Sequence, residues 1–278
     1  MSDNIRLPKD VEIGEDVEIH PDAKIDVRDR LIIGDRTVVN AGVEIMGRRV
    51  ELGRECWLAE GATIGGGSCF GADSRLLAGD WLHMGRGAHV NTARGVVLGD
   101  EVGLGRDTRV YTHGAYLSGW DGYPVSFKGV SVGDRAWLPA AIVNPGVSIG
   151  SDVVVAAMSV VERDLPAGCL AGGVPVRVLR QHAYPRTPTR RERLELLNEV
   201  MSAASCGSAR LTRTLVSIAW SKNEEPIGIK CEETMFNVQR RTIRGPVSEW
   251  TEALKNELRR HGIRFRYTAV NGDYVKWD

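Results

Sequence analysis

His113 lies near the start of a long interruption between Val110 and Val132, and this stretch is rich in tyrosine, glycine and serine and contains one tryptophan. The pKa of a free histidine lies near neutrality, so its imidazole can take a proton from a weakly acidic hydroxyl group. A general base of this kind speeds a transfer reaction by about 10²–10⁴-fold. The residues alone allow two interpretations: a catalytic base at the root of a binding loop, or a surface histidine beside an aromatic loop that packs on itself.

A six-residue repeat surrounds this loop and accounts for most of the first 180 residues. Its repeated position holds an aliphatic or large apolar residue, often followed by glycine, with a small or β-branched residue four positions on. Because a period of six fits neither an α-helix nor a hairpin, it predicts a short strand followed by a tight corner, with the apolar residue pointing inward. Three such units make one triangular coil, and coils stack at about 4.8 Å. The predicted inward residues are Ile13, Ile19, Ile25, Ile33, Val39, Ile45, Leu52, Leu58, Ile64, Phe70, Leu76, Met84, Val90, Leu98, Leu104, Val110, Val132, Leu138, Ile149, Val155 and Val161.

Glycine usage predicts where the repeat domain ends, since 27 of the 32 glycines precede residue 181. We expect a lead-in over residues 1–10, a parallel β-helix over 11–181 with the loop 112–131, and a small α+β domain over 182–278. In this last part, apolar spacing predicts helices over 189–204 and 248–260, and strands over 211–220, 232–243 and 263–270. The fold class is therefore mainly β.

Overall composition excludes several classes of function. The chain has 36 basic and 36 acidic residues, without the basic excess of a nucleic-acid-binding protein. Its five cysteines are odd in number and form no CxxC pair, which argues against a disulfide framework or a structural zinc site. The first residues, MSDNIRLPKD, lack the apolar core of a signal peptide, and no apolar run is long enough for membrane insertion. These features predict a cytoplasmic protein.

The segment Val132–Arg180 contains several ordered pieces: a tryptophan four residues after Gly133, NPGVSIG, the run ending in Ser159–Val161, DLP and GGVPVRV. Together they resemble the C-terminal coils of galactoside/maltose and polysaccharide O-acetyltransferases, members of the hexapeptide-repeat acyltransferase family. The resemblance covers most of residues 11–180 and does not extend to the last hundred residues. It implies a left-handed β-helix, acetyl-CoA as the acyl donor, transfer to a hydroxyl of a small-molecule or glycan acceptor, and a homotrimer.

Carried over position by position, the resemblance also implies roles for individual residues. His113 matches the histidine that deprotonates the acceptor hydroxyl, and Asn91 and Trp137 match acceptor-site residues. The positions that match CoA contacts are Ala140, Ala157, Arg163, Arg177 and Arg180. The chain departs from the family between Trp137 and Pro145, where it is one residue shorter, and this affects the match of Ala140.

Three alternatives remain open from the sequence. The first is an N-acyltransferase acting on an amino-sugar nucleotide. The second is a hydratase like the γ-class carbonic anhydrases, which share this fold and bind zinc through three histidines; His83 and His89 lie six residues apart, hence on neighbouring faces, so no metal site is expected. The third is a non-catalytic scaffold, since the repeat by itself shows only architecture. Cys169 has no nearby histidine in sequence and is expected to be a small core residue.

Overall fold

The computed structural model describes residues 4–206 and 216–277. The chain divides into two compact units, Met1–Arg186 and Thr187–Asp278. The boundary between them lies five residues beyond the predicted one. Each unit has its own hydrophobic core. Within the described residues, no helix combines the length and the apolar character needed to cross a membrane.

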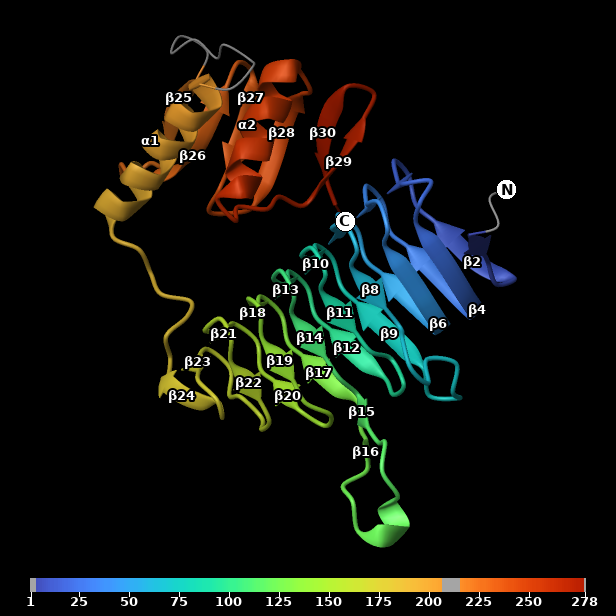
Figure 1. Ribbon diagram of the computed structural model, residues 1–278. Coiled ribbons are helices and arrows are strands. Elements are labelled where there is room, and N and C mark those ends of the chain that lie inside the picture. The colour runs from blue at the N-terminus through green and yellow to red at the C-terminus, as the bar shows by residue number, and fades with distance from the viewer. Residues whose placement is uncertain (1–3, 207–215, 278) are drawn as a thin grey trace. The chain divides into compact units, whose positions relative to one another are not determined.

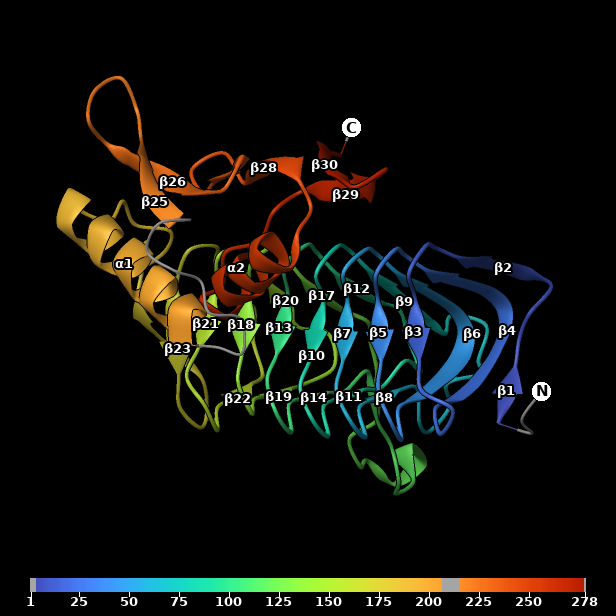
Figure 2. The ribbon, with the colours of Figure 1, turned by 90° about the horizontal axis from the view of Figure 1, so that it is seen from above.

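The first unit is a triangular parallel β-helix with three faces (Figures 1 and 2). The first face contains β8 (Thr63–Ile64), β11 (His89–Val90), β14 (Arg109–Val110), β19 (Ile142–Val143) and β22 (Val160–Val161). The second contains β9 (Arg75–Ala78), β12 (Val96–Leu98), β17 (Val130–Val132) and β20 (Ser148–Ile149). The third contains β3 (Glu18–Ile19), β5 (Val38–Val39), β7 (Trp57–Leu58), β10 (His83–Met84), β13 (Gly103–Leu104), β18 (Trp137–Leu138), β21 (Val154–Val155) and β23 (Leu170–Gly172). The predicted fold class, a mainly β chain with a left-handed parallel β-helix, is confirmed.

Both ends of the β-helix depart from this plan. At the start, β4 (Lys24–Ile33) and β6 (Glu44–Leu52) run without a break around the edge between the first and second faces. The short strands β1 (Ile5–Arg6) and β2 (Asp10–Ile13) pair with β4, so the predicted lead-in already takes part in the sheet. At the other end, β24 (Arg177–Arg180) turns back antiparallel to β23 and ends the stack.

The strand register places the predicted apolar residues over one another inside the prism. On the third face, for example, Leu58 pairs with Met84, which pairs in turn with Leu104, and all three are fully buried. Ile13 is an exception because the first coil has no earlier coil to cover it, and it is 46% exposed. The prediction for Phe70 is wrong: this residue lies in a corner insertion, with the guanidinium of Arg28 3.7 Å from its ring centroid.

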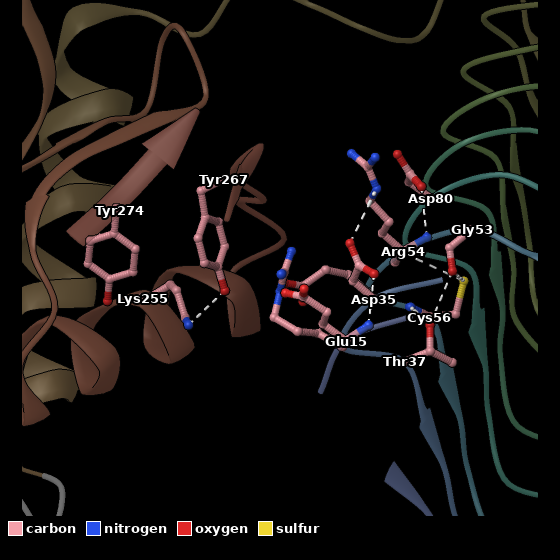
Figure 3. Close-up of polar contacts among 12 residues, drawn as sticks. Glu15, Asp35, Thr37, Gly53, Arg54, Cys56, Asp80, Lys255, Tyr267 and Tyr274 are labelled. Carbon is pink, nitrogen blue, oxygen red and sulfur yellow. Dashed lines mark hydrogen bonds and ion pairs between the residues drawn. The ribbon is translucent and has the colours of Figure 1, made fainter. Parts of the chain in front are cut away.

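One edge of the prism is held by a repeated contact between coils. The carboxylate of Asp35 accepts the Glu15 N–H at 3.0 Å, and the carboxylate of Asp80 accepts the Arg54 N–H at 2.8 Å (Figure 3). Asp100 and Asp134 repeat this contact higher in the stack. A Cβ atom on Gly53 would lie 2.5 Å from the Gly79 carbonyl carbon, so this crossing requires glycine. The glycine of each repeat therefore allows the coils to approach closely at this edge.

The second unit is a six-stranded antiparallel sheet with two helices, in agreement with the predicted α+β class. Its strands, in sheet order, are β25 (Val216–Trp220), β26 (Pro226–Cys231), β27 (Thr234–Asn237), β28 (Thr242–Pro246), β30 (Asp273–Lys276) and β29 (Tyr267–Val270). The helices are α1 (Arg190–Cys206) and α2 (Glu249–Arg260), and Ser248 caps α2 by accepting the Thr251 N–H. Lys255 of α2 donates to the Tyr267 hydroxyl at 2.8 Å (Figure 3).

Several strand predictions in this unit hold only in part. The strand predicted over 211–220 is present over Val216–Trp220, and residues 211–215 lie outside the described residues. The one predicted over 263–270 begins only at Tyr267, because the Ile263 N–H still bonds to Leu258 O at the end of α2. A turn divides the predicted run 232–243 into β27 and β28. The sequence did not indicate β26 or β30.

We expect a chain cut after Arg186 to keep a folded β-helix, because its core closes within stacked coils that each contact only their neighbours. This cut retains the bond from the Ala183 N–H to Gly168 O, at 2.6 Å, which fastens the end of the stack. Circular dichroism should show a β-rich spectrum with a cooperative thermal transition. A spectrum of unfolded chain would contradict the division into two units.

Candidate active site

Two insertions leave the β-helix at the same edge, between its first and second faces. One occupies residues 65–74, between β8 and β9, and the other occupies 111–129, between β14 and β17. The second insertion forms an arm that projects away from the prism, with β15 (His113–Gly114) paired to β16 (Ser126–Phe127) at its base and the 3-10 turn Gly119–Asp121 at its tip (Figure 1). His113 therefore lies where the arm joins the edge.

Asn91 connects the two insertions from a buried position on the same edge. Its side chain is 2% exposed, and its amide nitrogen donates to the carbonyls of Gly65 at 3.2 Å and Gly67 at 3.0 Å. Its amide oxygen lies 2.8 Å from His113 Nδ1 and accepts the Thr112 hydroxyl at 2.7 Å. The structure thus brings together Asn91 and His113, as the resemblance implies.

This network determines which nitrogen of His113 carries the proton. Because the amide nitrogen of Asn91 is committed to two carbonyls, its oxygen must face His113 and acts only as an acceptor. Nδ1 of His113 must then donate, and Nε2 is left with a free lone pair. An imidazole held in this form can accept a proton through Nε2 from a group on the open side of the site.

The open side is a groove of about 430 Å³ beside the root of the arm, lined by Tyr111, His113, Gly114, Pro124, Val125, Ser126, Asn144 and Pro145. The ring of Phe127 stacks on that of His113, with centroids 5.6 Å apart and planes inclined by 18°. Arg94 places its guanidinium 5.2 Å from the Phe127 centroid and pairs with Asp73 at 3.5 Å. The base of the arm therefore fixes the His113 ring from one side and leaves the groove open.

A second histidine lies close to this site. His89 is half-buried on the first face, and its ring centroid is 6.1 Å from that of Tyr111. Burial lowers the pKa of His89, and the positive charge of Arg109, together with that of His113 when it is protonated, lowers it further. His89 therefore belongs to the surroundings of His113, whereas His83 lies on the third face, as the six-residue spacing predicted.

The remaining predicted residues lie on other parts of the prism. Arg163 is exposed on the same edge as His113, two coils further along the first face, since β22 follows β14 and β19. It pairs with Glu162 at 2.7 Å. Ala140 and Ala157 lie at corners between the third and first faces, and Ala140 has a positive φ of 49°. Arg177 and Arg180 are exposed on β24.

Trp137 does not lie beside His113 within one chain. It sits on the third face, 42% exposed, with its ring so close over Gly103 that a Cβ there would be 2.4 Å from Trp137 Cε3. The sequence also gave no indication of Thr112 and Phe127, because their contacts with Asn91 and His113 depend on how the two insertions meet. Among the described residues, no group of three or more histidine, cysteine, aspartate or glutamate side chains could hold a metal ion.

Comparison with known proteins bears on the repeat unit. The chain is 40% identical over 53 residues to galactoside O-acetyltransferase of Escherichia coli, a match covering 19% of this chain and 26% of that enzyme. It is 32% identical over 114 residues to serine acetyltransferase of Helicobacter pylori, covering 38% of this chain and 64% of that one. The resemblance to the hexapeptide-repeat acyltransferases is confirmed. No family model matches the chain.

Solved structures with a similar arrangement include the polysialic acid O-acetyltransferase OatWY, at 15% identity and a TM-score of 0.46, covering 70% of this chain and 99% of that one. Another is an N-acyltransferase from Bacillus cereus in complex with dTDP and coenzyme A, at 21% identity and a TM-score of 0.41, covering 69% and 91%. The chain spans about a quarter of the length of the first curated relatives that it matches.

We expect Asn91→Ala to loosen the site at a measurable cost in stability. The change removes the amide that bonds the Gly65 and Gly67 carbonyls, which should lower the free energy of unfolding by about 1–3 kcal/mol. The matched control is Asn40→Ala, which also removes an amide bond to a backbone carbonyl, that of Leu58 at 2.7 Å, but on another edge. Acetyl-CoA turnover should fall by about 10²-fold in Asn91→Ala alone, the typical effect of misplacing a reacting group by 1 Å. Equal turnover in both variants would show that Asn91 does not position His113.

Proposed function

We propose that this protein transfers an acetyl group from acetyl-CoA to a hydroxyl group of a carbohydrate acceptor, with His113 as the general base. The observation that carries the proposal is the buried Asn91 amide, which holds His113 with Nε2 free beside an open groove. The sequence similarity to acetyltransferases of galactosides and of serine supports acetyl transfer.

The chemistry follows from the position of His113. As the acceptor oxygen attacks the thioester carbonyl, Nε2 of His113 takes the hydroxyl proton, and the C–S bond then breaks. The departing CoA sulfur receives that proton, so the imidazole returns to its starting form. The Asn91 oxygen accepts a hydrogen bond from Nδ1–H throughout and stabilises the imidazolium while it is charged.

The donor, in this proposal, lies along the later coils. Exposed cations at Arg163, Arg177 and Arg180 suit the phosphates of CoA, and the corner residues Ala140 and Ala157 suit its thin pantetheine arm. These positions lie on different edges of one chain, which supports a site completed by a neighbouring subunit.

We further propose a homotrimer. The arm exposes Tyr116 and Trp120 almost completely, at 98% and 96%, and large aromatic side chains with this exposure are typical of an interface. Trp137 is exposed on the third face and, in a trimer, is free to contribute to the acceptor site of an adjacent chain.

We expect His113→Ala to lower kcat by about 10²–10⁴-fold while CoA affinity and the unfolding transition stay close to wild type, because the base acts on the acceptor proton. Acetyl-CoA turnover against a panel of sugars gives the rate, and calorimetry gives the CoA affinity. The control is His83→Ala rather than a change at His89, which adjoins the site. Rates within a few-fold of wild type in His113→Ala would remove His113 from the mechanism. Turnover only with amino sugars would instead indicate N-acyl transfer.

We expect Arg177→Ala and Arg180→Ala to raise KM for acetyl-CoA and leave kcat nearly unchanged. A cation near a phosphate contributes equally to the bound substrate and to the transition state, so its loss weakens binding without slowing the chemical step. Steady-state kinetics with varied acetyl-CoA measures both constants. A fall in kcat alone would contradict the assignment of these arginines to the donor.

A further inference from the structure

Arg109 is an exposed cation on the first face, and no acidic side chain among residues 4–206 and 216–277 forms an ion pair with it. It follows His89 in the register of the sheet, so the two side chains point outward from adjacent strands about 4.8 Å apart. No hydrogen bond or ion pair joins Arg109 to another side chain in the part of the chain that the structure describes, although most arginines of the β-helix pair with an acidic residue. The next residue of the outward row, Ile142 on β19, carries no charge.

Arg109 is connected to the groove of the proposed catalytic histidine through Tyr111 and His89. Tyr111, two residues after Arg109, lines the groove with His113 and contacts the ring of His89. His89 packs on Gly66, where a Cβ would lie 3.1 Å from its Cε1, while His113 lies over Gly67, with the corresponding distance 3.5 Å. The two imidazoles thus share the glycine turn that Asn91 holds.

None of the described residues that line the groove carries a carboxylate. Lys128 lies at the root of the arm and extends its aliphatic chain over Gly146, and Arg94 is balanced by Asp73. Thr63, on the other side of His89, is neutral. A group bound beside Tyr111 therefore lies next to the imidazole of His89, and Arg109 is the residue paired with His89 on the adjacent strand.

We propose that Arg109, with His89 beside it, binds a carboxylate or phosphate group carried by the acceptor, so that the acceptor is an anionic saccharide. This inference rests on the proposed acetyl transfer for its reaction, but the binding site itself does not depend on it. Arginine presents a planar fork of donors that fits both oxyanions, and a neutral imidazole offers one more N–H. The anion anchors the sugar while its hydroxyl faces Nε2 of His113.

Binding is tested with simple probes and without turnover. Inorganic phosphate, D-glucuronate and the neutral methyl β-D-glucoside are titrated, at low ionic strength, into protein labelled in its histidine rings. The His89 signals are followed by NMR and assigned with His89→Asn. Phosphate and glucuronate should shift these signals saturably in the millimolar range and raise the pKa of His89, since a bound anion offsets the charge of Arg109. The glucoside should have no effect, and a response to only one anion identifies which of the two groups the site accepts.

The decisive variant is Arg109→Gln, and its matched control is Arg106→Gln, an exposed arginine on the neighbouring corner that pairs with Asp107. Arg109→Gln should abolish the anion-dependent shift of His89, and Arg106→Gln should retain it. Unchanged titrations in Arg109→Gln, or no saturable shift in wild type, would overturn the proposal.

Steady-state turnover with the two sugars provides a second, independent test. Wild type should favour glucuronate over methyl β-D-glucoside by about 10- to 100-fold in kcat/KM, and Arg109→Gln should remove that preference. An equal rate with both sugars would overturn the assignment of the acceptor class. If the His89 shift is present but His113→Ala keeps its turnover, the anion site stands and the proposed mechanism fails.

Discussion

Each coil of this β-helix must place its inward side chains directly over those of the coil before it, because parallel strands bond in a fixed register. An extra residue within the straight part of a strand would turn the inward set outward, so added residues are tolerated at the edges of the prism. Even the one-residue register shift within β4 lies where this strand turns around the edge. Both long insertions, 65–74 and 111–129, therefore leave at corners. They leave at the same edge, and this brings the glycine turn against His113. The position of the site thus follows from the geometry of the core.

The buried amide of Asn91 then orients the imidazole of His113 for proton transfer. An amide side chain has distinct donor and acceptor ends, and two backbone carbonyls of the first insertion hold the donor end. The acceptor end is left for Thr112 and His113 of the second insertion. Gly65 is buried, and a buried carbonyl without a partner is costly in a protein interior. The same bonds that join the insertions also orient the imidazole.

The sequence predicts the β-helix well because the lengths of the strand and the corner fix the spacing of inward residues at six. The buried series from Ile25 to Val161 follows directly from this spacing. It fails at Phe70, where an apolar residue keeps the period inside an insertion. It also cannot indicate that Trp137 lies on another face from His113, because the insertion 111–129 interrupts the six-residue count between them. In the second unit, β26 contains Pro226 and Gly228, and β30 alternates weakly, so neither carries a clear strand pattern.

The antiparallel return of β24 has a consequence for how such a molecule changes over evolutionary time. A parallel stack can in principle gain or lose a coil anywhere, since each coil repeats the same bonds to its neighbours. Here β24 pairs antiparallel with β23 and occupies the edge to which a further parallel strand would bond. The later coils therefore form a closed end of fixed length. Growth or shortening is then confined to the other side, where β1 and β2 are short and pair only with β4. Duplication or deletion of coils there would alter the height of the prism and leave the hydrogen bonds around Asn91 unchanged.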